Sequence, residues 1–438
     1  MSSGLVPLAD AQRRLAALVS PLAPHQVPLA EAVGLVLAED VAAAEAVPPF
    51  ACSAMDGYAL AATAEPAPLT LKVVRRILAG DVPGDAIGPG EAVRIMTGAP
   101  LPPGADAVCM LEDSEAAPDG AVVVLGHSPA LGEHVRHAGE DVAAGAVVLE
   151  RSSTLGPRHL GVLASLGRTA VLAHRRAVVG VLSTGSELVA APARLAPGQI
   201  RDSNRQALLA LVAAAGASAL DLGLVRDDED LAVAAVRAGA ERCDLLVTSG
   251  GVSVGDKDVV KAIIDRCCDH TEVLQVAIKP AKPLAFGRLE GGGVLIGLPG
   301  NPVSSVVSFE LFVRPTIAAL GGGEAPGTVQ AIAGEALSRP VDGKLHLLHV
   351  RVEVDGDGRL VAWRSGGRAS HLLASTVAAN ALALVADGPG VPSGAVVPVL
   401  PLTGARWPAS VRPLPGEQAE RVGDKVEDGL EGLDGACC

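Results

Sequence analysis

Aromatic residues are scarce in this sequence, whose 438 residues include four Phe, two Trp and one Tyr. Surfaces that bind single-stranded nucleic acid rely on exposed aromatic side chains for stacking, so we expect no nucleic-acid partner. The net charge of −14 at pH 7 also repels polyanions and membrane surfaces. The cores must be packed from Ala, Val, Leu and Ile, and an anionic ligand needs a local pocket of cations.

The sequence also lacks the cysteine spacings typical of metal sites, and it lacks long apolar runs. The seven cysteines form no CxxC pair and no Cys/His spacing typical of zinc sites, so we expect reduced, buried thiols. The longest uncharged apolar run, residues 207–220, falls short of the roughly 20 residues that cross a bilayer. The first residues reach Asp10 without the apolar stretch of a secretory signal. These features predict a soluble cytoplasmic protein without a membrane partner.

Helical periodicity occurs on both sides of a segment with a β pattern. Apolar residues recur at three- to four-residue spacing near the N-terminus, including residues 29–37, and again in residues 151–166. Short β-type runs separated by Gly and Pro lie between them. We therefore expect a helical N-terminal domain, residues 1–45 and 140–175, interrupted by an inserted β domain, residues 46–139.

The central part of the chain, residues 176–325, repeats one unit: an apolar strand, a Gly-rich polar turn and a helix. This alternation predicts a mostly parallel sheet covered by helices, with ligands bound beyond the carboxyl ends of the strands. Residues 326–410 return to a β pattern and predict a second small β domain. Residues 411–438 are charged and Gly-rich without apolar periodicity, which predicts a disordered tail.

Polar, Gly-containing turns are predicted at three strand ends: STGSEL (183–188), TSGGVSVGDKD (248–258) and LPGNP (298–302). Small residues let backbone N–H groups approach an anion, and hydroxyls can donate to it, so the three turns together resemble a phosphate cradle. Any one of them alone is explained as a tight turn. The sequence contains no P-loop or GxGxxG motif, which disfavours P-loop NTPases and dinucleotide dehydrogenases. The cradle candidates are Ser183, Gly185, Gly250, Gly251, Ser253, Gly255, Pro299, Gly300, Asn301 and Pro302.

Two lysines lie three residues apart between prolines in the segment KPAKP (279–283). Because the prolines restrict the backbone and remove amide donors, the ammonium groups of Lys279 and Lys282 are expected to converge on one dianion. The alternative is a solvated pair of surface lysines, but the apolar flanks and the prolines argue against it.

Acidic residues lie in or beside the same turns: Glu187, Asp227, Asp228, Asp256 and Asp258. Carboxylates beside phosphate are expected mainly with a divalent cation between them, so a Mg²⁺ site is predicted. Asp227 has a simpler explanation as a helix cap, because the acidic run it starts opens a helix. Glu187 and Asp258 each follow a Gly-containing turn and are the metal candidates that remain.

Two further polar segments, SAMDGYA (53–59) and RIMTGA (94–99), lie in the expected inserted domain. By composition alone, each is a turn. The ten histidines show no metal-ligand spacing, and no Ser-His-Asp or Cys-His pairing can be assembled from the sequence. We therefore assign no covalent nucleophile.

These motifs, taken in order, resemble the MoeA family of molybdopterin molybdenumtransferases, which is similar to the E domain of gephyrin. The resemblance covers about residues 5–405. It rests on SAMDGYA (53–59), RIMTGAPLPPGADAV (94–108), GED (139–141), STGSEL (183–188), DSN (202–204), RDD (226–228), TSGGVSVGDKD (248–258), KPAKP (279–283) and LPGNPVS (298–304).

The resemblance implies a multidomain α/β plus β fold. Its parts are a helical domain with an inserted β domain, a central, mostly parallel α/β molybdopterin-binding domain, and a C-terminal β-barrel. It also implies a homodimer whose active site lies between the α/β domain of one subunit and the inserted domain of the other. A molybdopterin adenylyltransferase is a candidate partner.

The activity implied by the resemblance is the last step of molybdenum cofactor synthesis, in which adenylylated molybdopterin and molybdate give the cofactor and AMP, with Mg²⁺. Asp56 and Thr97 would reach across the dimer, while Glu187, Asp227 and Asp258 would serve the adenylate, with Glu187 and Asp258 as metal ligands. The implied oxyanion contacts are Lys279, Lys282, Ser304 and Ser375.

The chemistry of the residues agrees with this activity. Molybdate is a dianion, so a net acidic protein must offer it local lysines. Cleavage of a phosphoanhydride needs positioned water, metal and charge neutralisation rather than a covalent nucleophile.

The sequence departs from the family pattern at three positions. Ser186 stands where the family often has Asp, which removes one metal ligand. Ala281 stands where Gly is frequent and requires a backbone compatible with a Cβ. His349 stands where Arg is common, and a histidine is mostly neutral at pH 7.

Two alternatives stay open. A related α/β domain performs molybdopterin adenylylation, although the additional β domains argue against that reaction here. A scaffold protein that kept the fold, as gephyrin did, is the other alternative, although the turn carboxylates and the lysines argue for retained chemistry.

Overall fold

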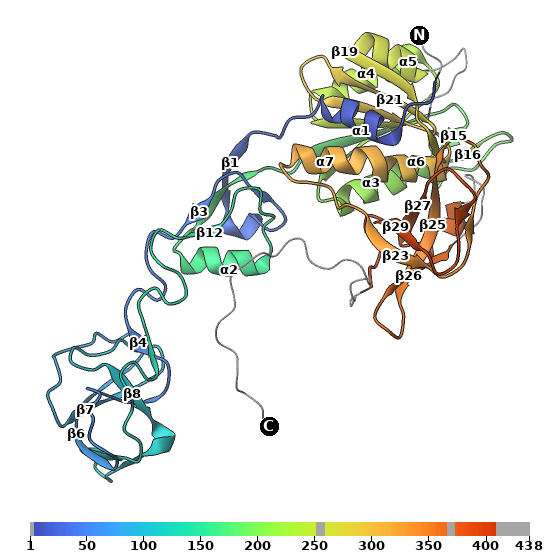
Figure 1. Ribbon diagram of the computed structural model, residues 1–438. Coiled ribbons are helices and arrows are strands. Elements are labelled where there is room, and N and C mark those ends of the chain that lie inside the picture. Colours follow the sequence, from blue (N-terminus) through green and yellow to red (C-terminus); the bar gives the residue numbers. More distant parts are fainter. Residues whose placement is uncertain (1–3, 251–258, 366–372, 409–438) are drawn as a thin grey trace. The chain divides into compact units, whose positions relative to one another are not determined.

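The computed structural model of the protein describes residues 4–250, 259–365 and 373–408 (Figure 1). The chain forms two compact units. Residues from Leu22 to Arg175 form the N-terminal unit, whereas residues from Arg176 onward, together with those up to Pro21, form the C-terminal unit.

The centre of the C-terminal unit is a six-stranded sheet with the order β17-β14-β18-β22-β21-β19. The first four strands are parallel, and the last two are antiparallel to their neighbours. This arrangement confirms the expected mostly parallel sheet. The strands are β14 (Val178–Thr184), β17 (Ser218–Val225), β18 (Leu245–Ser249), β19 (Cys268–Gln275), β21 (Pro283–Leu289) and β22 (Val294–Leu298).

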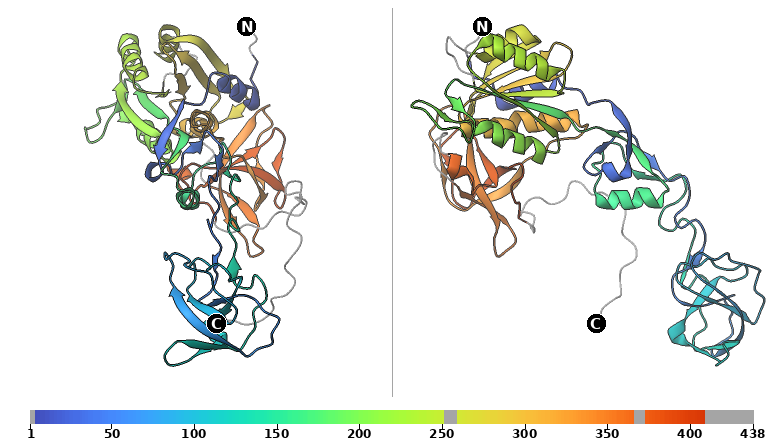
Figure 2. Two further views of the ribbon diagram at one scale, coloured as in Figure 1. Left: turned by 90° about the vertical axis from the view of Figure 1, so that its left-hand side faces the viewer. Right: turned by 180° about the vertical axis from the view of Figure 1, so that it is seen from behind.

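Helices cover both faces of this sheet, with α4 and α5 on one face and α3 and α6 on the other (Figures 1 and 2). Because both faces are covered, β18 and β22 are buried at every position, which explains their continuous apolar runs. The helices are α3 (Asn204–Ala214), α4 (Glu229–Ala240), α5 (Val259–Cys267) and α6 (Pro302–Ser308), which continues through the π-helical turn η3 (Phe309–Val313) into α7 (Arg314–Leu320).

One helix among the described residues, Pro302–Leu320, passes the length and composition test for a membrane span. It is the continuous α6–η3–α7 helix, and 72% of its apolar window is buried inside the structure. Its apolar residues pack within the α/β domain, as expected of a core helix.

The second expected β domain is a closed five-stranded barrel, because β25 pairs with both β26 and β27. A short strand, β20 (Ile278–Lys279), leaves the α/β domain and pairs with β25, so that Lys279 lies opposite His346. The barrel strands are β23 (Val329–Ala333), β25 (Leu345–Val354), β26 (Leu360–Arg364), β27 (Ala381–Val385) and β29 (Val396–Pro401).

A buried carboxylate ties the π-helical turn to the chain that follows the barrel. Glu310 is 2% exposed and accepts hydrogen bonds from Thr403 N (2.7 Å) and Thr403 Oγ1 (2.9 Å). Arg314 Nη1 donates to Glu310 Oε2 (2.9 Å) and to the carbonyl of Pro401 (2.7 Å). Burial raises the pKa of Glu310, so its bonds offset part of a desolvation penalty. This group fixes how the barrel packs beside the α/β domain.

The N-terminal unit contains a three-stranded sheet with helix α2 (Pro157–Ser165) and a separate six-stranded β sheet. The strands expected in the inserted domain are confirmed, and the chain's only Tyr, Tyr58, is buried in the six-stranded sheet. The strands of that sheet, in spatial order, are β8 (Ala107–Met110), β5 (Gly57–Leu60), β7 (Glu91–Ile95), β6 (Leu69–Ile77), β10 (Val122–Leu125) and β9 (Ser114–Ala116).

The prediction of a helix over residues 29–37 is wrong. The chain there forms strands β1 (Pro24–Pro28) and β2 (Val36–Leu37), separated by the short 3₁₀ turn η1 (Leu29–Glu31). Prolines at both ends of β1 favour extended backbone, and Gly34 has a φ of 80°, outside the helical region. A three- to four-residue apolar spacing over so short a segment does not distinguish a helix from a strand and a turn.

The first helix, α1 (Leu8–Ala16), is real but belongs to the C-terminal unit. Gln12 Nε2 donates to the carbonyl of Leu311 (2.9 Å), which joins α1 to the core helix. The region expected to be a helical domain, residues 1–45 and 140–175, therefore contains both helix and strands, and its first helix, α1, belongs to the other unit.

The cysteines of the described residues are free thiols, as expected. Burial raises the pKa of Cys109 to about 11 and that of Cys268 to about 12. Both thiols are protonated and unreactive at neutral pH.

Candidate functional site

The carboxyl ends of β14, β18 and β22 lie side by side, because these strands are parallel neighbours in one sheet. Gly250 N donates to the carbonyl of Leu298 (3.2 Å), which joins the turn after β18 to the end of β22. Gly185 N donates to the carbonyl of Val225 (3.1 Å) at the end of β17. The structure thus brings the turns of the expected cradle to one edge of the sheet.

Part of the second turn lies outside the described residues. This part contains Gly251, Ser253, Gly255 and Asp258, which the sequence singled out. Ser375 lies on η4 (Leu373–Thr376), but its side chain is also outside the described set.

Gly250 occupies a place where no other residue fits without movement. Its φ is +102°, and a Cβ there would lie 2.3 Å from the carbonyl oxygen of Thr184 on β14. A Cβ on Gly300 would lie 3.5 Å from the Cα of Gly250. The backbones of all three strand ends therefore approach one another closely at this position.

Two adjacent acidic residues at this edge have different contacts: one caps a helix, and the other binds a turn. Asp228 caps α4, since its Oδ1 accepts from Leu231 N (3.0 Å). Asp227, for which the sequence offered the cap as the simpler explanation, instead accepts from Ser186 N (3.0 Å) and donates its own N–H to Ser186 Oγ (3.1 Å). This reciprocal pair holds Asp227 against the turn that carries Glu187.

A metal at this edge would depend on few protein ligands. No group of three or more His, Cys, Asp or Glu side chains in the described ranges is arranged to hold a metal ion. Mg²⁺ is usually held by one or two carboxylates together with substrate phosphates and water. Glu187 and Asp227 provide carboxylates of that kind at neighbouring strand ends, so the donor chemistry fits a magnesium ion shared with a phosphate ligand.

Ser183 lies deeper than the sequence suggested. Its side chain is fully buried, and Ser183 Oγ donates to Asp202 Oδ1 (3.0 Å). The neighbouring hydroxyls Thr184 Oγ1 and Thr248 Oγ1 are buried without a hydrogen-bond partner among the described residues. Ser183 therefore braces β14, while two other hydroxyls lie unpaired near the strand ends.

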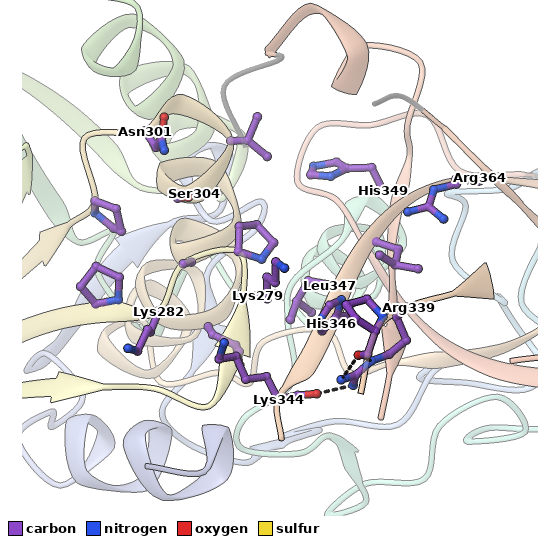
Figure 3. Close-up of a pocket in the computed structure, with 18 of the residues that line it drawn as sticks. Lys279, Lys282, Asn301, Ser304, Arg339, Lys344, His346, Leu347, His349 and Arg364 are labelled. Atoms are coloured by element: carbon purple, nitrogen blue, oxygen red, sulfur yellow. Dashed lines mark hydrogen bonds between the residues drawn. The ribbon is translucent and has the colours of Figure 1, made fainter. Parts of the chain in front are cut away.

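A cavity of about 750 Å³ lies between the α/β domain and the barrel (Figure 3). It is lined from the α/β side by Lys279, Lys282, Pro299, Gly300, Asn301 and Ser304. It is lined from the barrel side by polar residues that include Arg339, Lys344, His346, His349 and Arg364. Pro302, the remaining candidate of this turn, begins helix α6 beside the cavity.

The two lysines expected from the sequence supply the cavity with charge that is not neutralised. Lys279 and Lys282 are exposed and form no ion pair with another described residue. By contrast, the buried guanidinium of Arg339 is bound by Asp342 (2.7 Å) and Asp387 (2.5 Å). An anion that enters the cavity therefore finds its strongest attraction on the α/β side.

Ala281, between the lysines, has a φ of 73° and is 4% exposed. A residue with a Cβ in this left-handed region costs roughly 1–2 kcal/mol. The expectation that this position has a backbone compatible with a Cβ is therefore wrong, because Ala281 adopts the left-handed conformation that favours glycine.

His349 lines the cavity as a neutral group. Burial lowers its pKa to about 4, and its Nε2 has no hydrogen-bond partner among the described residues. A neutral imidazole can donate or accept a hydrogen bond but adds no charge at pH 7. The expectation from the sequence that this position is uncharged agrees with its surroundings.

Asp56 and Thr97 are brought together within the N-terminal unit. Asp56 Oδ1 accepts from Thr97 N (2.7 Å) and from Thr97 Oγ1 (2.8 Å). The backbone bond, and then the hydroxyl bond, hold the pKa of Asp56 below its ordinary range. The carboxylate is therefore ionised and oriented by the second motif of its own domain.

Apart from His349, the barrel side of the cavity was missed by sequence reasoning. Lys344, His346 and Arg364 lie on or beside β25 and β26, whose pattern indicated only a small β domain. A basic or imidazole side chain on a strand is common on a solvated face, so the sequence carries no signal that these residues meet the KPAKP segment.

Comparisons with known proteins give consistent matches along the chain. A family model described as "MoeA N-terminal region (domain I and II)" matches residues 6–167, one described as "Probable molybdopterin binding domain" matches residues 180–319, and one described as "MoeA C-terminal region (domain IV)" matches residues 336–402.

Two relatives from bacteria are named molybdopterin molybdenumtransferase. The protein from Haemophilus influenzae is 39% identical over 377 residues, which are 85% of this chain and 92% of the relative. The protein from Bacillus subtilis is 34% identical over 417 residues, which are 93% of this chain and 97% of the relative. A crystal structure described as molybdopterin biosynthesis MoeA protein from Pyrococcus horikoshii superposes with a TM-score of 0.76 at 29% identity, covering 92% of this chain and 100% of that one.

We expect Gly250→Ala to destabilise the protein more than Gly216→Ala. Both glycines have positive φ, at +102° and +86°, but a Cβ on Gly216 meets no atom within 4 Å. Gly216→Ala should cost about 1–2 kcal/mol of unfolding free energy, and Gly250→Ala about 1–3 kcal/mol more, because its Cβ collides with Thr184. Urea denaturation measures both values; equal losses would contradict the close approach of the strand ends.

The imidazole of His349 should titrate near pH 4. Its Cε1–H signal can be assigned by its loss in His349→Gln and followed by NMR. Because the unfolded chain takes up this proton near pH 6.5, acidification from pH 6.5 to 4 should destabilise the wild type more than the variant. A midpoint near 6.5 would show that the imidazole is solvated rather than enclosed in the cavity wall.

Proposed function

The chain belongs to the MoeA family of molybdopterin molybdenumtransferases, and we propose that its active centre inserts molybdate into adenylylated molybdopterin with release of AMP. Its role lies in molybdenum cofactor biosynthesis, and its substrates are molybdopterin-related small molecules. The observation that carries the detailed proposal is the cavity in which two unpaired lysines lie beside the Gly-rich turns of the sheet.

Molybdate binding is assigned to the α/β side of the cavity. Molybdate is a tetrahedral dianion, and Lys279 and Lys282 supply two positive charges that no described carboxylate neutralises. Ser304, 6% exposed in the first turn of α6, adds a hydroxyl to the same wall. Charge-assisted hydrogen bonds of this kind contribute about 1.5–3 kcal/mol each.

The phosphates of the adenylate are assigned to the turns at the strand ends. Gly250, Gly300 and Asn301 bring backbone close to one point without bulky side chains. In the proposed step, a water oxygen forms a bond to one phosphorus of the phosphoanhydride, and the bond from that phosphorus to the bridging oxygen breaks. The bridging oxygen stays on the other phosphate, the protons of the water pass to solvent, and AMP and the molybdopterin phosphate separate. The carboxylates of Glu187, Asp227 and Asp258 are proposed to orient that water and to serve the adenylate.

We propose Mg²⁺ as the cofactor of this step, with Glu187 and Asp258 as its protein ligands. When bound, the ion would neutralise charge on the phosphates. Asp227 stands beside Glu187 through its contact with Ser186 and compensates in part for the acid that Ser186 replaces.

We also propose a homodimer in which Asp56 and Thr97 of one subunit serve the substrate bound by the other. The support is the family resemblance together with the ionised, oriented carboxylate of Asp56. Supply of the adenylate by a molybdopterin adenylyltransferase partner and a cytoplasmic location stay predictions.

AMP release from adenylylated molybdopterin tests the proposal. We expect release that requires both molybdate and Mg²⁺, with a loss of about tenfold or more in kcat/KM for Lys279→Met, because one charge-assisted contact is removed. Lys261→Met is the matched control, since Lys261 is an exposed lysine of α5 outside the cavity lining.

Equal kcat/KM in both lysine variants would contradict the assigned molybdate site. Transfer of AMP from ATP to molybdopterin, without molybdate-dependent release, would favour the adenylyltransferase alternative.

A further inference from the structure

The motif DSN (202–204) lies beneath the proposed site without a role in the proposed chemistry. Asn204, the first residue of α3, spans two strand ends: its Nδ2 donates to Ser249 Oγ (2.8 Å) and to the carbonyl of Gly300 (2.7 Å). Ser249 ends β18 and is 2% exposed, whereas Gly300 lines the cavity after β22. One amide group therefore connects the turns that follow two neighbouring strands.

The residue two positions earlier makes the same kind of connection to the third strand. Asp202 Oδ1 accepts from Ser183 Oγ on β14 (3.0 Å) and from Arg205 N (3.2 Å), and Asp202 Oδ2 accepts from Arg205 Nε (2.8 Å). Arg205 Nη1 also donates to Asp221 on β17. Residues 202–205 thus form one hydrogen-bonded group that links the middle of β17 to the ends of β14, β18 and β22.

We propose that Asn204 is a positioning residue that holds the turns after β18 and β22 in the geometry that binds the substrate's phosphates. This inference rests on the proposed function for the identity of the substrate. Asn204 does not line the cavity itself. It acts through Gly300, which does line the cavity. Without the bond to its carbonyl, the Gly300 peptide can rotate, and the N–H groups of the turn lose their common direction.

The chemistry of the side chain explains why an amide stands here. The two acceptors, a hydroxyl and a carbonyl, need two N–H donors from one neutral group, which Asn provides with a short stem. Asp is nearly the same size but would turn a carboxylate oxygen toward the Gly300 carbonyl. Preorganised donors cost no ordering when the ligand binds, so their loss should appear mainly in substrate affinity.

The first test is the kinetics of Asn204→Asp and Asn204→Ala. We expect KM for adenylylated molybdopterin to rise about tenfold, with kcat changed less than about threefold. Ser249→Ala should raise KM by a smaller factor. The Asn204→Ala/Ser249→Ala double variant should add little to Asn204→Ala alone, because the bond that Ser249→Ala removes is already lost in Asn204→Ala.

Asn380→Ala is the matched control. In the barrel, Asn380 Oδ1 accepts from Val352 N (2.7 Å), and Asn380 Nδ2 donates to the carbonyls of Val352 (2.9 Å) and Arg406 (3.3 Å). It is an amide of equal size that ties two chain segments away from the cavity lining. Its loss should lower the melting temperature without raising KM; equal KM changes in both variants would reduce Asn204 to a general structural role.

Hydrogen exchange supplies a readout that does not depend on activity. In Asn204→Asp, the peptides that contain Ser249–Gly250 and Leu298–Asn301 should exchange faster than in the wild type, while β25 should not change. Unchanged exchange and unchanged KM would overturn the inference. The two proposals can fail separately. If the wild type shows no molybdate-dependent AMP release, the proposed function is overturned. If Asn204→Asp still shows the expected faster exchange, the positioning role of Asn204 remains supported.

Discussion

Parallel alignment of β14, β18 and β22 is the constraint on which the rest of the site depends. Parallel neighbours place their carboxyl ends at one edge of the sheet, so the turns that follow them must share that edge. The close approach of Gly250 to the backbone of Thr184 and to Gly300 is possible because Gly250 and Gly300 have no side chain. The contacts of Asp227 with Ser186 and of Asn204 with Gly300 then hold neighbouring turns in register.

The distribution of charge explains how a strongly acidic protein offers a site for dianions. Some cations that line the cavity are balanced, as Arg339 is by Asp342 and Asp387. Lys279 and Lys282 differ because neither ammonium group forms an ion pair with a carboxylate among the described residues. Pairing of β20 with β25 fixes this segment against the barrel, and Glu310 braces the two domains from the core helix.

The sequence predicted the centre of the α/β domain well, because β14, β18 and β22 are buried almost throughout and each is followed by a Gly-containing turn. It also identified both lysines of the cavity. It failed at residues 29–37, where a short apolar spacing fits strands as well as a helix, and it did not distinguish Asp228 from Asp227 as the cap of α4. Apart from His349, which the family resemblance singled out, the barrel half of the cavity, with His346 and Arg364, was not predicted. Periodicity reports burial within a domain and not which domains pack together.

The most direct test of the account is the position of molybdenum in a crystal of the protein soaked with molybdate and AMP, located by anomalous scattering at the molybdenum edge. The account predicts one strong peak in the cavity between the α/β domain and the barrel, within hydrogen-bonding distance of the ammonium groups of Lys279 and Lys282. A peak away from these lysines, or an empty cavity at a molybdate concentration that saturates binding in solution, would contradict it.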